Sequence, residues 1–64
     1  MSYYYFIKNI SGHYAADPNR NPTGRSYTPR IEYARVFTTL DAARAECCGN
    51  EYVVTLADII QVNL

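Results

Sequence analysis

The sequence predicts an α+β fold, in which one helix packs on one face of a small antiparallel sheet of three or four strands. Three observations support this. Aromatic and β-branched residues, which favour strands, dominate segments 2–10 and 51–56. An alanine-rich segment follows two threonines and predicts one helix. With only 64 residues, the chain has room for one small core, so residues 1–64 are expected to form a single domain.

The first two predicted strands are joined by a tight turn. Segment 2–10 alternates along its length, and both of its faces carry apolar side chains. It is therefore expected to be a central strand, or an edge strand that a partner subunit covers. Gly12 marks the turn, and segment 13–16 is expected to return as a short strand.

A long loop is predicted over residues 17–30. It contains all three prolines of the chain, together with Gly24 and several asparagine, serine and threonine residues. These residues favour turns over regular structure. Loops of this length in a short chain are typically functional or disordered.

The second half of the chain is expected to run strand, helix, strand, which gives the order β-β-loop-β-α-β. Segment 31–37 predicts a short strand. Thr38 is the expected N-cap of the helix, with Asp41 completing a capping box. The helix is expected to end near Cys48, where Gly49 would supply a left-handed residue. Its buried stripe is expected to comprise Leu40, Ala43 and Cys47.

The last predicted strand covers residues 51–56 and continues through 59–62, with a bulge or bend at Asp58. Tyr52 in this strand and Tyr5 in the first are expected to lie in the core. No lysine or proline blocks the edge of this segment, and unblocked edges pair with other chains. The sequence therefore predicts a homo-oligomer formed through a sheet edge.

The order of these features resembles a group of small, functionally undefined phage-encoded proteins. That group begins with a strand of the form Tyr-Tyr-x-Ile-Lys-Asn, carries an Ala-Arg/Lys-Val-Phe segment and an alanine-rich helix, and closes with a valine-rich strand. The resemblance covers most of the chain outside the loop, and it implies a phage setting and no particular site. The matching residues are Tyr4, Phe6, Ile7, Lys8, Asn9, Gly12, Tyr14, Ala34, Arg35, Val36, Phe37, Thr39, Ala42, Ala43, Ala45, Tyr52, Val53 and Val54.

The charge pattern predicts a local anion site. The net charge is zero, which argues against general nucleic-acid binding. Residues 18–30 nevertheless carry three arginines and no acid, and arginine suits phosphate and carboxylate groups. Tyrosines near them could stack on a ligand. The alternative is an ordinary solvated loop. The expected ligand-binding residues are Arg20, Arg25, Arg30, Tyr14, Tyr27 and Tyr33.

Catalysis is not expected. His13 is far in sequence from Cys47 and Cys48, and a helix C-terminus disfavours a thiolate. No metal-ligand spacing or cofactor motif appears, so neither a metal nor a cofactor is predicted. Adjacent cysteines rarely form a disulfide. Without a secretory or membrane-spanning segment, we expect a cytoplasmic protein, in the host cytoplasm if a phage encodes it.

The sequence therefore predicts a non-enzymatic binding protein. The leading hypothesis is a phage counter-defence protein that sequesters a small anionic ligand, such as a cyclic nucleotide signal. One alternative is an inhibitor that docks on a host protein complex, in the manner of an anti-CRISPR protein. Another is an accessory structural or regulatory phage protein.

Overall fold

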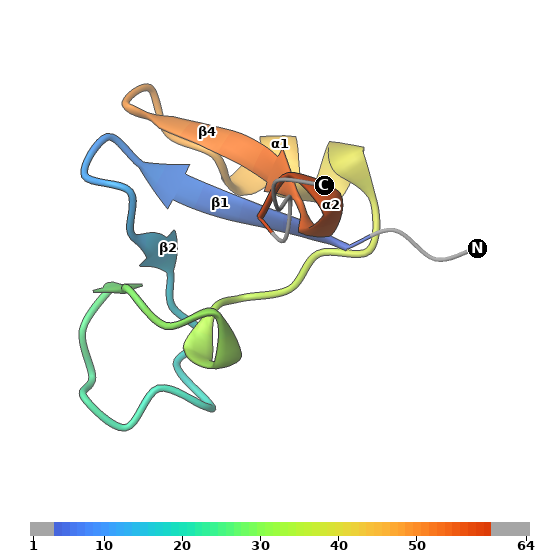
Figure 1. Ribbon diagram of the computed structural model, residues 1–64. Coiled ribbons are helices and arrows are strands. Elements are labelled where there is room, and N and C mark those ends of the chain that lie inside the picture. Colours follow the sequence, from blue (N-terminus) through green and yellow to red (C-terminus); the bar gives the residue numbers. More distant parts are fainter. Residues whose placement is uncertain (1–3, 60–64) are drawn as a thin grey trace, which may run out of the picture.

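The computed structural model describes residues 4–59, which form a four-stranded antiparallel sheet with helices on both faces (Figure 1). The predicted α+β fold is confirmed. The strands are arranged in the order β3-β2-β1-β4. Along the chain the elements are β1 (Tyr5–Asn9), β2 (Tyr14–Ala15), β3 (Tyr27–Thr28), the 3-10 helix η1 (Ile31–Tyr33), α1 (Leu40–Glu46), β4 (Glu51–Thr55) and α2 (Leu56–Ile59).

β1 lies between β2 and β4, so of the two predicted alternatives the central strand is confirmed. On one face Ile7 is buried with Ala43 of α1. On the other face Phe6 is buried with Tyr14 and Ala34, and partly buried side chains of η1 and α2 pack against them. Figure 1 shows α1 behind the sheet and α2 in front of it. The alternation along β1 therefore divides the core into two small clusters, one on each face.

The predicted strand over 31–37 is wrong, because this segment begins as the 3-10 helix η1. Ile31 and Ala34 are three residues apart and both pack in the Phe6 cluster. A spacing of three matches one 3-10 turn, in which such side chains share a face. The N–H of Ala34 donates to the carbonyl of Ile31 at 3.0 Å. Beyond η1 the segment meets the sheet only at isolated bridges, including Tyr5 with Phe37.

α1 forms where a helix was predicted, but both of its predicted ends are wrong. Its N-cap is Thr39 rather than Thr38, and the Thr39 side chain accepts the N–H of Ala42 at 3.1 Å. The helix ends at Glu46, and Cys47 is already extended. Gly49 is not left-handed, since Gly12 and Gly24 are the residues with positive φ in the described part of the chain.

The predicted strand over 51–56 is confirmed as β4, but its continuation is wrong because the chain turns into α2. The side chain of Asp58 accepts the N–H of Thr55 at 3.0 Å, and the N–H of Asp58 donates to the hydroxyl of Thr55 at 3.1 Å. This reciprocal pair is a capping box, with aspartate in place of glutamate. Residues 60–62 of the predicted strand lie outside the described residues.

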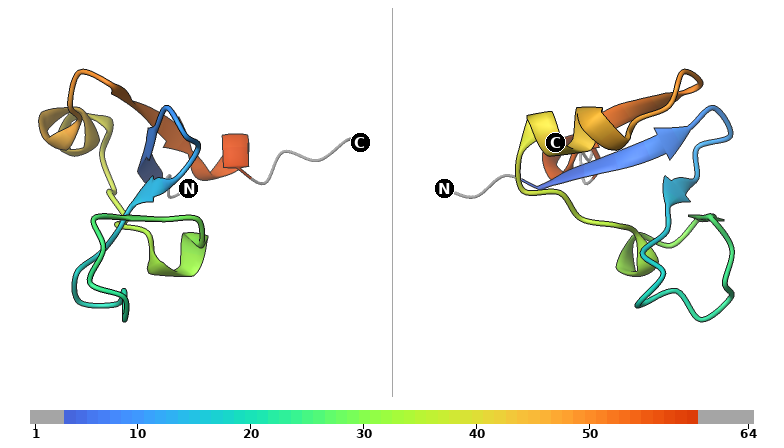
Figure 2. Two further views of the ribbon diagram at one scale, coloured as in Figure 1. Left: turned by 90° about the vertical axis from the view of Figure 1, so that its left-hand side faces the viewer. Right: turned by 180° about the vertical axis from the view of Figure 1, so that it is seen from behind.

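Two further expectations about tyrosines and the loop differ from the structure. Tyr5 is half-buried in the Ile7 cluster, but Tyr52 is 47% exposed, because its side chain lies on the part of the sheet that α1 does not cover. The loop 17–30 projects from the sheet (Figure 2) and contains the two-residue strand β3.

None of the helices described within residues 4–59 has the length and apolar character needed to cross a membrane.

Candidate functional site

The loop 17–30 is closed mainly by polar side chains. Asn21 is its centre, with only 6% of its surface exposed. The Nδ2 of Asn21 donates to the carbonyl of Arg25 at 2.8 Å, and its Oδ1 accepts from both the N–H and the hydroxyl of Thr23. The N–H of Asn21 donates to the carbonyl of Asp17 at 2.8 Å. Asn21 thus gives this loop a defined shape, a role that sequence reasoning missed although asparagine in a proline-rich turn signals it.

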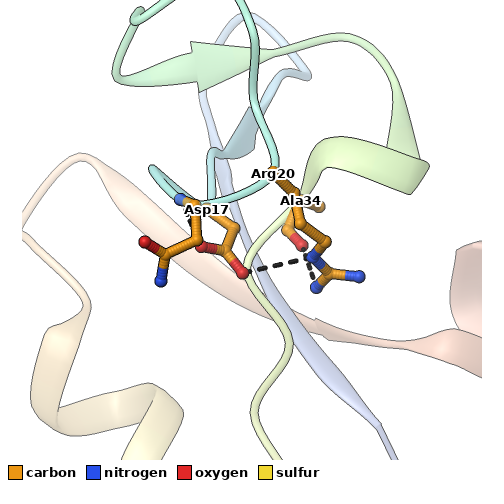
Figure 3. A network of polar contacts seen from close by, with 4 residues as sticks. Asp17, Arg20 and Ala34 are labelled. Atoms are coloured by element: carbon orange, nitrogen blue, oxygen red, sulfur yellow. Dashed lines mark hydrogen bonds and ion pairs between the residues drawn. The ribbon is translucent and has the colours of Figure 1, made fainter.

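The guanidinium of Arg20 makes polar contacts with other residues of the protein (Figure 3). Its Nε lies 3.2 Å from the Oδ2 of Asp17, and its Nη2 donates to the carbonyl of Ala34 at 3.1 Å. The N–H of Asn19, with the Arg20 guanidinium beside it, holds the pKa of Asp17 below its ordinary value, against a smaller opposing effect of burial. Arg20 therefore ties the loop to the segment after η1, and its charge is already balanced.

Arg25 lies differently, at the wall of a shallow pocket of about 280 Å³. Its backbone is held at both ends, by Thr23 at the N–H and by Asn21 at the carbonyl. Its guanidinium has no carboxylate partner among residues 4–59. The pocket is lined by Ala16, Pro18, Gly24, Arg25 and Ser26.

Gly24 and Ser26 give the pocket an open wall and a free hydroxyl. Gly24 has a φ of +73°, which a residue with a side chain rarely adopts, and no atom lies within 4 Å of where a Cβ would stand. The side chain of Ser26 makes no hydrogen bond within the described part of the chain. Arg25, Ser26 and the accessible backbone of Gly24 are therefore neighbours along one pocket.

Arg30 and Tyr33 belong to the opposite side of this loop, around η1. The Nη1 of Arg30 lies 3.6 Å from the Oε2 of Glu32, and both side chains are mostly exposed. Tyr33 anchors the loop through its backbone, because its carbonyl accepts the N–H of Asp17 at 2.9 Å. Neither residue lines the Arg25 pocket.

Tyr14 and Tyr27 are held by other parts of the sheet. Tyr14 is 8% exposed and packs edge-on against Phe6, with ring centres 6.1 Å apart. The hydroxyl of Tyr27 donates to the Oε2 of Glu51, which connects the two outer strands. Of the six residues predicted to bind the ligand, Arg25 is the one that lines this pocket.

The Glu51 carboxylate links Tyr27 to the cysteines. Its second oxygen, Oε1, accepts the N–H of Cys48 at 2.8 Å. The Tyr27 hydroxyl lowers the pKa of Glu51, and the Glu51 carboxylate in turn raises the pKa of Tyr27. Burial, followed by the nearby charge of Glu51, raises the pKa of Cys47. At neutral pH the Cys47 thiol is therefore protonated and a poor nucleophile.

The outer edge of β4 is largely occupied. The N–H of Leu56 donates to the carbonyl of Tyr4, so the backbone groups of Glu51, Val53 and Thr55 point away from β1. The N–H of Glu51 donates to the carbonyl of Cys48, and the N–H of Thr55 donates to the carboxylate of Asp58. Among the described residues only the Val53 N–H is left open on this edge, and an oligomer formed through it stays a prediction.

Comparison of the chain with models of protein families, with curated proteins and with solved structures finds no match. The resemblance to phage proteins therefore stays a prediction. The described residues contain no group of three or more metal-ligating side chains.

Proposed function

We propose that the protein binds a small anionic ligand in the pocket beside Arg25, and that it acts by binding rather than by catalysis. The observation that carries this proposal is the contrast among the three loop arginines. Arg20 and Arg30 each have a carboxylate within 4 Å, whereas Arg25 has none in the described chain. A guanidinium without a carboxylate partner, on a residue that lines a pocket, attracts a phosphate or a carboxylate.

The other pocket residues support the same chemistry. A phosphate oxygen approaching Arg25 could also accept a hydrogen bond from the hydroxyl of Ser26. The missing side chain at Gly24 leaves room for the ligand beside the backbone. A volume of about 280 Å³ is near the lower end for small-molecule sites, so the pocket suits one phosphate with its sugar. A cyclic di- or trinucleotide would leave part of itself outside.

The biological role that we infer is sequestration. A phage protein that binds a cyclic nucleotide signal would lower the free concentration of that signal and act in counter-defence. Such a role needs affinity and no reactive group, in keeping with the raised pKa of Cys47. The phage setting rests on the sequence resemblance alone.

Isothermal titration calorimetry tests the proposal with cyclic mono-, di- and trinucleotides and inorganic phosphate. The charge-assisted hydrogen bonds of one arginine contribute about 1.5–3 kcal/mol, so Arg25→Ala is expected to weaken binding roughly tenfold or more. Arg44→Ala is the matched control, because it removes the same charge from α1. Absence of binding at millimolar ligand, or an equal loss in both variants, would refute the proposal.

A further inference from the structure

A row of side chains crosses the whole sheet on the face opposite α1. Lys8 of β1 is directly opposite Tyr14 of β2 on one side and Tyr52 of β4 on the other. Tyr14 is in turn opposite Thr28 of β3. Directly opposed residues in antiparallel strands point to the same face, so the row is Thr28, Tyr14, Lys8 and Tyr52.

Lys8 is a cation without an acidic partner among the described residues, and a tyrosine stands opposite it on each neighbouring strand. Its Nζ lies 5.3 Å from the ring centre of Tyr14, a distance typical of a cation–π contact. No carboxylate within residues 4–59 forms an ion pair with it. The contact with the ring of Tyr14 favours this position of the ammonium and leaves its charge without a counter-ion.

The row is open at its Lys8–Tyr52 end, whereas Tyr14 and Thr28 are only 8% and 4% exposed and Ile31 of η1 packs on the cluster that contains Tyr14. α2 covers this face at one end, where Leu56 packs on the Phe6 cluster. In Figure 1 α2 lies in front of the right-hand end of β1 and β4, and no described helix lies over the end where β1 finishes and β4 begins. Tyr52 is 47% exposed there, and Ile10, directly after β1, is 79% exposed.

We propose that the open end of this row, Lys8 and Tyr52 together with Ile10, is a docking surface for an acidic segment of a partner protein. A carboxylate of the partner pairs with Lys8, and an apolar side chain next to that carboxylate packs on Tyr52 and Ile10. Exposed tyrosine is enriched at interface hot spots, and the Lys8 cation gives the surface its charge preference. A single lysine on a chain of zero net charge does not provide the basic face that nucleic acid requires.

The partner segment binds through its side chains rather than as an added strand. Adding a strand to β4 would need free N–H groups along its outer edge. Those of Glu51 and Thr55 are already bonded to Cys48 and Asp58. The docking surface is also separate from the Arg25 pocket, so it does not depend on the anion-binding function.

The probe that tests this proposal is a pair of peptide arrays incubated with the labelled protein. One array holds octapeptides with Asp or Glu next to Phe, Leu or Tyr, and the matched array has Asn or Gln in place of the acid. We expect the acidic array alone to bind. Lys8→Gln is expected to lower the affinity for the best acidic peptide about tenfold, the usual effect of one charge pair at an interface. Tyr52→Thr, which keeps a strand-favouring residue, is expected to lower it similarly.

The controls separate this surface from the pocket and from loss of folding. Arg25→Ala and Arg44→Ala are expected to bind the peptides as the unaltered protein does, and circular dichroism checks that each variant folds. Equal binding of the amide array, unchanged binding by folded Lys8→Gln, or no peptide binding at 1 mM would overturn the proposal. Tighter binding of an oligothymidine than of any peptide would overturn it in favour of nucleic acid.

Discussion

The paired strands β1 and β4 and the loop 17–30 are held by different forces. β1 and β4 are joined by a backbone ladder of five residue pairs and bury Phe6 and Ile7 on opposite faces. The loop contains the buried polar residues Asn21 and Thr28, and its shape depends on side chains that bond to nearby backbone groups. The sheet is therefore expected to tolerate polar changes in the loop, while the loop depends on single hydrogen bonds.

The largest effect is expected in the sheet. Ile7 is 2% exposed, so Ile7→Ala is expected to lower the free energy of unfolding by about 2–5 kcal/mol. Ile7→Val should cost only about 0.5–1.5 kcal/mol and keep the protein folded. Urea denaturation measures both variants. If Ile7→Ala lowered the free energy of unfolding by less than a substitution in the loop does, the sheet would not be held mainly by its apolar core.

The loop should respond most to loss of the Asn21 side chain. Asn21→Ala leaves the carbonyl of Arg25 without its donor, and we expect a cost of about 1–3 kcal/mol. Hydrogen exchange should accelerate in the loop while β1 and β4 stay protected. Asn19→Ala is the control, because the Asn19 side chain makes no hydrogen bond within the described residues. Equal acceleration in the two variants would show that Asn21 is not the centre of the loop.

The capped edge of β4 gives the next prediction. Asp58→Ala frees the Thr55 N–H beside the open N–H of Val53, and a strand edge with free donors self-associates. Sedimentation velocity is expected to show a larger mass for Asp58→Ala than for Asp58→Asn, whose side-chain oxygen can still accept the N–H of Thr55. Identical masses for the two variants would mean that the cap does not protect the edge.

The smallest effect concerns the link between Tyr27 and Glu51, and it depends on pH. The Tyr27 hydroxyl lowers the pKa of Glu51 below 4.5, so this contribution to stability is present above pH 4.5 and is lost as the pH falls through the lower value. The raised pKa of Tyr27 adds stability that is present below pH 10 and lost as the pH rises further.

Thermal unfolding of Tyr27→Phe between pH 2 and pH 8 checks the acid limb. The difference in Tm from the unaltered protein should be largest near neutral pH and should shrink on acidification. Asp17 and Asp58 also have lowered pKa values. Both the unaltered protein and Tyr27→Phe contain these two residues, so their effects cancel in the difference in Tm. A difference in Tm that stays constant with pH would exclude the link.

Residue type and alternation were sufficient to predict β1, β2, β4 and the existence of α1. They failed where a local polar contact overrides an apolar run. Thr55 and Asp58 have capping-box spacing, but the apolar residues after Asp58 favoured a strand. For η1, the three-residue spacing of Ile31 and Ala34 was the available signal.

The anion site was predicted only as a region of the chain, although the spacing of the acids separates its three arginines. Asp17 is three residues before Arg20 and Glu32 is two residues after Arg30, whereas the acids nearest to Arg25 are seven and eight residues away. Arg20 lies beside Asp17 because the turn around Asn21 brings them together. Interactions between residues far apart in sequence, such as Tyr27 with Glu51, have no local signal at all.

Anion binding beside Arg25 is tested most directly by a nitrogen-15 NMR titration of the protein with inorganic phosphate and then with a cyclic nucleotide. We expect the amide signals of Gly24, Arg25 and Ser26 to shift with saturation, and Arg25→Ala to abolish these shifts. Saturable shifts confined to other residues, or shifts that persist in Arg25→Ala, would contradict anion binding in this pocket.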